Sequence, residues 1–227
     1  MTQAAPAQGY AAGREVTARG RSTRDRIVRV AAELMFLRGV AGTSIPDVLE
    51  AAGVSASQVY HYFGDKQGLV RAVIAHQIEV ALEHQRPILD CLDSFEALEM
   101  WRDGAITLQQ ARNCEGGCEI GSLACELVET DAVARADLVA AFDRWETPIR
   151  TGLRTMRRRG ELSRDADPAH LATAMLAAVQ GGLLLTQVRR STEPLYAAIT
   201  AMIDYIRTFA VPAHDDDGPP AGRTPRC

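Results

Sequence analysis

The stretch from Ser44 to Lys66 constrains the fold of this chain more than any other part of it. Ser44 precedes an apolar run and Asp47 follows three residues later, a spacing typical of a capping box at a helix start. Gly53 stands where that helix must end, because glycine enters the left-handed region without a steric penalty. Ser55 and Gln58 repeat the capping pattern almost at once. Two short helices joined by a tight turn are typical of a helix-turn-helix.

The two predicted helices, one over residues 45–52 and one starting after Ser55, use their side chains differently. Val48, Val54 and Val59 are apolar at the positions where the two helices would cross and pack on a third. The outward positions of the second helix carry side chains that mostly hydrogen-bond or stack and rarely carry charge. They are Ala56, Ser57, Gln58, Tyr60, His61 and Tyr62. Such a face suits the reading of base edges in a DNA groove.

The ordered series of residues from Thr23 to Leu69 resembles the DNA-binding domain of the tetracycline-repressor (TetR) family. It comprises a helix ending in Gly39, then Gly42-Thr43-Ser44, Ala51-Ala52-Gly53-Val54-Ser55, Val59-Tyr60-His61-Tyr62-Phe63 and Asp65-Lys66. The resemblance implies a homodimeric transcription regulator with its N-terminal domain on DNA and an effector in a helical C-terminal domain. The chain departs from the family pattern at Leu49, Ala56 and Gly64, where a small alanine, a lysine and a proline are common.

On this hypothesis the second helix lies in the major groove of double-stranded operator DNA. Ser57, Gln58 and His61 are the candidates for base edges, since glutamine suits adenine and serine can serve either way. Phosphate contacts are expected from Thr43, Tyr60, His61 and Lys66. The full predicted DNA-binding set is Thr43, Ser44, Ser55, Ala56, Ser57, Gln58, Tyr60, His61, Tyr62 and Lys66. Two-fold symmetry predicts an inverted-repeat operator, with recognition helices about 34–36 Å apart or at a related spacing.

Charge is divided unevenly along the chain, which has 227 residues and a formal net charge of −4. Residues 1–71 carry nine arginine and lysine side chains against six acidic ones, so the acidic excess lies in the remainder. Basic charge is therefore concentrated at the end that would meet phosphates. Hydrophobic residues make up 47% of the chain, and alternating strand-like runs are missing, which favours an all-α fold.

The composition predicts four consecutive segments. The first helix is expected to begin at Ser22 or Thr23, after an Ala/Gly-rich stretch with scattered arginines. The segments are a disordered basic arm over 1–21, the helix-turn-helix domain over 22–66, a regulatory domain for effector binding and dimerisation over 67–211, and a disordered tail over 212–227. No apolar stretch approaches the ~20 residues of a membrane span, and no signal-peptide pattern is found. We therefore expect a cytoplasmic protein without a membrane partner.

Three short motifs in the regulatory segment carry a second resemblance. Cys114-Glu-Gly-Gly-Cys118, Leu123-Ala-Cys-Glu126 and Phe142-Asp-Arg-Trp145 look like the C-terminal domain of a TetR subgroup typified by flavonoid-responsive regulators of multidrug-resistance genes. The resemblance implies a small hydrophobic or aromatic effector, held between the helix that starts near Asp65 and the helices that follow. The predicted pocket residues are Trp101, Cys118, Phe142, Trp145 and Gln180.

Two apolar helices are predicted near the C-terminus, one starting at Asp167-Pro168 and one at Thr192 or Glu193 before Pro194. The first leaves almost no polar side, so it must be buried all round, and the pair needs a partner surface. We expect a homodimer through the helices 168–190 and 194–210, which would form a four-helix bundle between two subunits. The alternative is that these helices cover the pocket of their own chain.

The five cysteines raise an alternative function, since Cys114, Cys118 and Cys125 could form a redox or metal sensor. Their spacing is not that of a zinc module, and buried cysteine commonly acts as a small hydrophobe. We expect neither a metal site nor a disulfide framework. An all-helical enzyme is a remoter alternative, because no nucleophile elbow, phosphate-binding glycine loop or metal-spaced histidine pair occurs. The sequence thus predicts a ligand-responsive repressor with no catalytic residue and no cofactor.

Overall fold

The computed structural model of the protein describes residues 18–212, and their regular structure is α-helical apart from one isolated bridge. The helices in this range are α1 (Ala18–Arg38), α2 (Ile45–Ala52), α3 (Ala56–Phe63), α4 (Lys66–Leu89), α5 (Phe95–Ala111), α6 (Glu119–Leu127), α7 (Ala132–Arg158), α8 (Pro168–Arg189) and α9 (Glu193–Arg207). The bridge pairs Leu162 with Ala210 and ties the chain after α9 to the loop after α7. The all-α prediction is confirmed.

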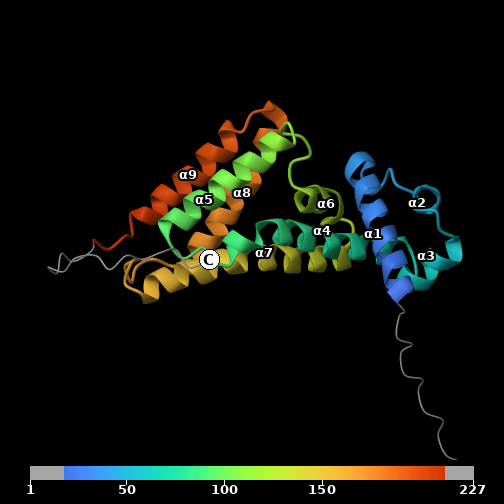
Figure 1. Ribbon diagram of the computed structural model, residues 1–227, viewed down its shortest axis with the longest axis horizontal. Coiled ribbons are helices and arrows are strands. Elements are labelled where there is room, and N and C mark those ends of the chain that lie inside the picture. Colours follow the sequence, from blue (N-terminus) through green and yellow to red (C-terminus); the bar gives the residue numbers. More distant parts are fainter. Residues whose placement is uncertain (1–17, 213–227) are drawn as a thin grey trace, which may run out of the picture.

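Helices α1, α2 and α3 form a small head at one end of the molecule, and α4 leads away from it (Figure 1). The α2 helix has the predicted bounds, with Ser44 as its N-cap and Asp47 completing the capping box. Gly53 ends it at φ 60°, in the left-handed region, as its position predicted. Beneath both helices, Val48 and Val59 are almost fully buried against α1 and α4. The head is thus shaped by local turn and capping chemistry.

The start of α1 differs from the prediction, because the helix begins at Ala18 and not at Ser22 or Thr23. Residues 18–21, assigned to the disordered arm, are therefore helical. Alanine and arginine are strong helix formers, so the helix continues through the hydroxyl residues that could have capped it. The rest of the predicted arm and nearly all of the predicted tail lie outside the described residues.

The remaining helices form a larger unit, here called the sensor. In Figure 1, α4 and α7 run side by side along the molecule, α5, α8 and α9 pack together at the far end, and α6 lies between this unit and α1. Packing is very close at Gly152 of α7, where an added Cβ would lie 1.9 Å from the carbonyl oxygen of Leu92. Gly182 of α8 likewise allows the backbone of α9 to approach α8 closely at Leu195. Gly181, in contrast, faces open space.

The α8 helix corrects two predictions. It is long and apolar enough to cross a membrane by length and composition alone, although no such stretch was expected. It is also not buried all round in the single chain, because 44% of its most apolar window is buried, and Leu184, Leu185 and Val188 remain exposed. Its other face packs in the core through Leu171, Met175 and other residues. A core helix with one unpartnered apolar face meets the same criterion as a membrane span.

Candidate DNA-binding and effector sites

The outer surface of α3 carries the side chains predicted to face DNA. Ala56, Ser57, Gln58, Tyr60 and His61 are exposed, and Tyr60 is 53% accessible. Tyr62 is only half-buried, with its ring edge-on to those of His61 and Phe63 at centroid distances of 5.2 and 6.1 Å. Because Val59 of the same helix is anchored in the core, the exposed side chains are held in a fixed orientation on the surface.

Gln58 has two roles that compete. Its Oε1 accepts hydrogen bonds from the backbone N–H of Ser55 at 2.9 Å and from the Ser55 hydroxyl at 3.2 Å, in keeping with the predicted capping partnership. Bidentate reading of adenine uses both the oxygen and the nitrogen of a glutamine amide. Gln58 can therefore offer its Nε2 to a base without disturbing the helix start, but it must release Ser55 to read adenine with both atoms.

Other predicted DNA contacts are already engaged within the head. The Thr43 side chain is buried, and its hydroxyl donates to the carbonyl oxygen of Gly39 at 2.9 Å, which removes it from the candidate DNA contacts. The Ser44 hydroxyl donates to Asp47, and this bond lowers the pKa of the Asp47 carboxyl. The Ser55 hydroxyl lies 2.9 Å from that of Ser57.

Lys66, the only lysine of the chain, donates from Nζ to the carbonyl oxygen of Val40 at 2.7 Å. An ammonium group has three donors, so this bond leaves capacity for a phosphate. The same bond joins the start of α4 to the turn between α1 and α2. Lys66 thus belongs both to the candidate DNA surface and to the internal frame of the head.

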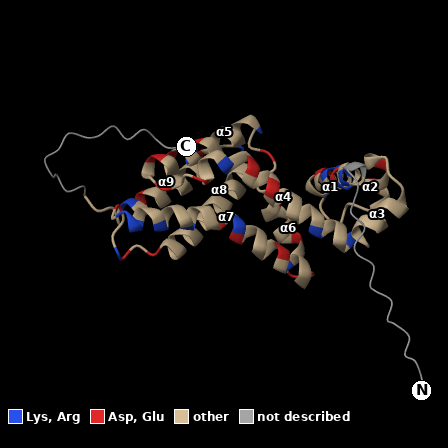
Figure 2. Ribbon diagram, turned by 60° about the horizontal axis from the view of Figure 1, so that its bottom comes forward, with Lys and Arg blue, Asp and Glu red and all other residues tan. Residues whose placement is uncertain are grey.

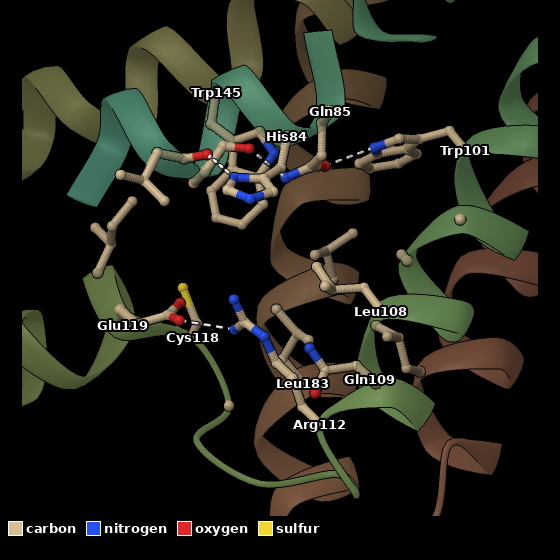
Figure 3. Close-up of a pocket in the computed structure, with 18 of the residues that line it drawn as sticks. His84, Gln85, Trp101, Leu108, Gln109, Arg112, Cys118, Glu119, Trp145 and Leu183 are labelled. Atoms are coloured by element: carbon tan, nitrogen blue, oxygen red, sulfur yellow. Dashed lines mark hydrogen bonds and ion pairs between the residues drawn. The ribbon is translucent and has the colours of Figure 1, made fainter. Parts of the chain in front are cut away.

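A cavity of about 230 Å³ lies inside the sensor (Figure 3). Its wall is formed by Gln77, Val80, Ala81, His84, Gln85, Ile88, Trp101, Gly104, Ala105, Leu108, Gln109, Arg112, Gly117, Cys118, Glu119, Ile120, Trp145, Val179, Leu183 and Leu195. Of the predicted pocket residues, Trp101, Cys118 and Trp145 are on this wall. Phe142 and Gln180 are not among the lining residues, since Phe142 packs on the core one helical turn before Trp145 and Gln180 lies behind Cys118 and Gly121.

The polar part of the wall was missed by the sequence analysis. Trp101 donates from Nε1 to Gln85 Oε1 at 2.8 Å, and Arg112 forms an ion pair with Glu119 at 2.7 Å. These pairs join residues 16 and 7 positions apart, across a loop in each case. No short motif marks them, because each residue reaches the cavity only through the packing of its helix. Figure 3 shows the tryptophans near one end of the cavity and Arg112 and Glu119 near the other.

Two polar atoms of the wall lack a hydrogen-bond partner among the described residues. They are Nε1 of Trp145 and Oε1 of Gln109. Both residues are buried, with relative exposures of 5% and 3%. A buried polar group without a partner is costly, typically by about 1–3 kcal/mol. Both residues line the cavity, but the two atoms themselves have almost no accessible surface.

Cys118 is the N-cap of α6, and its Sγ accepts a hydrogen bond from the backbone N–H of Gly121 at 3.3 Å. Burial raises the pKa of the Cys118 thiol, so it is neutral at physiological pH. Cys114 is buried and Cys125 is exposed, and all three have free thiols. Between residues 18 and 212, no group of three or more His, Cys, Asp or Glu side chains is placed to hold a metal.

The α6 helix touches both sites. Its N-cap and first turn, Cys118 to Ile120, line the cavity. Near its other end, Oε2 of Glu126 accepts a hydrogen bond from the backbone N–H of Val40 at 2.8 Å. Gly39 lies directly under that carboxylate, because an added Cβ would be 3.0 Å from Oε2. Val40 is thus held by Glu126 through its N–H and by Lys66 through its carbonyl oxygen.

Two known protein families match this chain. The family described as "Bacterial regulatory proteins, tetR family" matches residues 27–73. A second family, "Tetracyclin repressor-like, C-terminal domain", matches residues 95–202. Together the two matches span more than half of the chain. The chain belongs to the TetR family.

The relatives of this TetR-family chain are transcriptional regulators, and each match covers nearly the whole length of the relative. The HTH-type transcriptional repressor DhaR of Mycobacterium sp. (strain GP1) is 26% identical over 80% of this chain and 90% of its own. The HTH-type transcriptional repressor NemR of Escherichia coli (strain K12) is 27% identical over 83% of this chain and 96% of its own. A TetR transcriptional regulator from Chloroflexus aurantiacus J-10-FL matches in structure with a TM-score of 0.72 and 27% identity, over 86% and 98%.

The TetR family accounts for the pairing of a helix-turn-helix head with a helical sensor. The chain is a DNA-binding transcriptional regulator, and the alternative of an all-helical enzyme is set aside because the family and the relatives are regulators. The family assigns the head to DNA and the sensor to a ligand. The contacts of this TetR-family chain then show how the two parts are joined, through α4 and through the Glu126 carboxylate of α6.

Proposed function

We propose that this regulator is cytoplasmic and represses transcription by binding an inverted-repeat operator as a homodimer. A small apolar or aromatic compound in the cavity releases the protein from the operator. The observation that carries the proposal is the placement of α6. One end of this helix lines the cavity, and the other end holds the backbone of Val40 in the head. A molecule that shifts the first turn of α6 therefore acts on the head directly.

At the DNA end, α3 enters the major groove. Ser57, His61 and the Nε2 of Gln58 face base edges, while Tyr60 and Lys66 meet phosphates. The exposed positions of Ser57, Gln58, Tyr60 and His61 support this assignment, as do the basic residues along α1 (Figure 2). Ser44, Ser55 and Tyr62 frame the contact, since the two hydroxyls are engaged locally and the Tyr62 ring is half-buried. Ala56 is exposed beside them and offers only a methyl group.

At the other end of the molecule, α8 and α9 join two subunits. Leu184, Leu185 and Val188 form an exposed apolar face on α8, with relative exposures of 59, 44 and 71%. An apolar face of this kind on a helix that is otherwise core is a candidate for a self-complementary contact across a two-fold axis. Dimerisation sets the separation of the two α3 helices, and hence the spacing of the half-sites.

The switch is a difference in ligand affinity between two arrangements of the sensor. In the arrangement described here, Glu126 holds Val40, and Val40 holds Lys66 at the start of α4. A ligand that enters between Trp145 and α6 favours an arrangement in which Cys118 and Glu119 stand further from α7. Because α6 is a short rigid rod, this displacement reaches Glu126 and changes the angle of the head relative to α4.

The test uses the full chain and no assumed operator. Rounds of selection from random duplex DNA should enrich an inverted repeat, and sedimentation should give two subunits per bound duplex. A library of planar aromatic compounds should contain members that release the selected duplex. A chain that stays monomeric, or that enriches no symmetric sequence, would overturn the proposal.

A thiol-based signal is the second candidate, because Cys118 lies on the cavity wall. The raised pKa of its thiol argues against it, since the thiolate is the reactive form. Treatment with N-ethylmaleimide at pH 7 separates the two. Modification of the exposed Cys125 alone, with operator binding intact, supports the small-molecule signal. Rapid modification of Cys118 with loss of operator binding supports the thiol signal.

A further inference from the structure

The loop between α5 and α6, residues 113–117, lies between the cavity and the head. Resting on the proposed function, we propose that this loop transmits a change at the cavity to the head, and that Phe36 of α1 is the positioning residue that receives it. The contact is separate from the hydrogen bond of Glu126, which lies at the other end of α6. Three features of the loop support the proposal: the contact at its tip, the ion pair at its base and its strained backbone.

The tip of the loop rests on the head at Gly116. An added Cβ at this glycine would lie 2.3 Å from Cζ of Phe36, and 3.2 and 3.3 Å from its Cε1 and Cε2. The aromatic ring therefore packs directly on the backbone of the loop. Phe36 belongs to the last turn of α1 and lies four residues before Val40, which Glu126 holds. The head is thus contacted at both ends of α6, and a tilt of α6 moves one contact relative to the other.

The base of the loop is closed at the cavity. Arg112, which follows α5, forms an ion pair at 2.7 Å with Glu119, the first residue of α6, and both side chains line the cavity. Gly117 and Cys118 belong to the same wall. Figure 3 shows the ion pair joining the two ends of the loop. A molecule in the cavity can therefore touch the base of the loop, and one that separates the two charged side chains allows the loop to open.

The backbone of the loop is strained. Asn113 and Cys114 have φ values of 52° and 55°, in the left-handed region that residues with a Cβ rarely adopt. Between residues 18 and 212 the one other non-glycine residue with positive φ is Arg190, and it donates to the carbonyl oxygen of Cys114 at 3.1 Å. Strain of this kind persists only where the surrounding contacts impose it. The loop therefore has less strained conformations available to it once one of its contacts is removed.

Gly160, in the loop after α7, is a matched glycine without a contact to the head. Its φ is 78° and that of Gly116 is 85°, so a side chain at either position carries a similar backbone penalty. An added Cβ at Gly160 meets no atom within 4 Å, whereas at Gly116 it meets the ring of Phe36. The two glycines thus differ in the contact and hardly in φ.

Operator affinity of alanine variants tests the tip of the loop. The full chain is titrated with the duplex that the wild-type protein enriches from random DNA. Gly116→Ala should lower the affinity about five- to tenfold, because its Cβ displaces Phe36, whereas Gly160→Ala should change it less than about twofold. In the Phe36→Ala background, Gly116→Ala should also change it less than about twofold. Equal losses in the two glycine variants, or the same loss with and without the Phe36 ring, would overturn the inference.

Fluorine NMR of the full chain tests the base of the loop without DNA or effector. The five phenylalanines are replaced by 3-fluorophenylalanine, and Phe36→Leu identifies the Phe36 resonance. Arg112→Gln and Glu119→Gln remove opposite charges but open the same ion pair, so both should shift this resonance in the same direction. Phe63, at the end of α3, is the control and should not shift.

Three fluorine results would contradict the relay. They are a Phe36 resonance that stays in place in both variants, one that moves no more than that of Phe63, and shifts of opposite sign, which would report the change of charge alone.

The fluorine measurement also separates this inference from the proposed function. If the Phe36 resonance responds as expected but no symmetric duplex is enriched, the relay through Phe36 stands and the proposed function fails. If aromatic compounds release a selected operator while the resonance stays in place in both variants, the function stands and the inference fails.

Discussion

The head and the sensor are built from the same secondary structure but held together in different ways. In the head, Ser44 bonds to Asp47 and Ser55 bonds to Gln58, contacts that span three residues of sequence. In the sensor, Glu79 pairs with Arg144 and Arg71 with Asp137, contacts that span 65 and 66 residues. The DNA-reading surface is therefore fixed by contacts between residues close in sequence, whereas the cavity forms only when helices distant in the sequence meet.

The largest effect is expected where the sensor joins two heads. Leu184→Arg places a charge on the exposed apolar face of α8 and should dissociate the dimer. Because two linked heads bind ~10²–10⁴-fold more tightly than one, operator affinity should fall by that order. Sedimentation and gel shift measure the two consequences. Val139→Arg, at a similarly exposed valine of α7, is the control and should leave both unchanged; dissociation by both variants alike would contradict the α8 interface.

Glycine substitutions compare the helix packing of the sensor with the turn geometry of the head. Gly152→Ala would drive a Cβ into the Leu92 carbonyl oxygen and should cost about 3 kcal/mol of unfolding free energy or more. Gly53→Ala meets no atom within 4 Å and carries only the left-handed backbone penalty, about 1–2 kcal/mol. Urea titration gives both values. Gly181→Ala, in open space within α8, should stabilise by ~0.5–1 kcal/mol, and a reversed order of the three would refute the contrast.

Gln58→Glu separates the two roles of this side chain. The carboxylate still accepts from Ser55 N–H, and glutamate is a usual residue of a capping box, so the stability of the head should be unchanged. The Nε2 donor is lost and a negative charge faces DNA, so operator affinity should fall about tenfold or more. Thermal unfolding and fluorescence anisotropy provide the two readouts. Gln110→Glu on α5 should affect neither, and a loss of stability at Gln58 without loss of affinity would assign it to capping alone.

Glu126→Ala cuts the contact between sensor and head. Effector affinity in the free protein should stay within about twofold, while effector-induced loss of operator affinity should shrink about five- to tenfold, within the usual range of coupling energies. Both are measured by titrating effector with and without operator present. Glu129→Ala, three residues further along and exposed, should keep full coupling. Full coupling in Glu126→Ala would show that this hydrogen bond does not carry the signal.

The smallest effect concerns His76, on α4 beside α1. Burial lowers the pKa of His76 below 6.5; Asp25 opposes this shift and Arg29 adds to it. The unfolded chain then binds a proton that the folded chain does not, so stability is complete above pH 6.5 and declines as pH falls through the folded pKa. His76→Gln should flatten the fall in melting temperature between pH 7 and pH 5. An unchanged slope would place the sensitivity elsewhere.

The sequence was informative where contacts are short in sequence. The bounds of α2, both capping boxes and the helix starts at Asp65 and Asp167 could be predicted, because each depends on residues within one turn. The start of α1 could not, since helix propensity there outweighed a weak cap signal. Thr43 is the clearest failure in the head, because its hydroxyl turns inward to Gly39.

For the cavity, sequence reasoning found the aromatic residues and missed the polar ones. Trp101 and Trp145 stand out in any apolar stripe, but Gln109 and the Arg112–Glu119 pair lie in segments without a motif. Which of Phe142 and Trp145 faces inward depends on the rotation of α7 against α4, and periodicity leaves both open. Similarly, the exposed face of α8 is invisible in a run of apolar residues that predicts burial on every side.

The hydrogen bond between Glu126 and Val40 depends on a backbone group in the head and on a side chain in the sensor. On the side of the head it uses a peptide N–H, which every residue except proline possesses, so almost no substitution at position 40 can delete it. On the side of the sensor it depends on one carboxylate. Substitutions can therefore remove this contact chiefly on the sensor side, at Glu126. A different helix-turn-helix head with the same turn, fused to this sensor, would form the contact without further change.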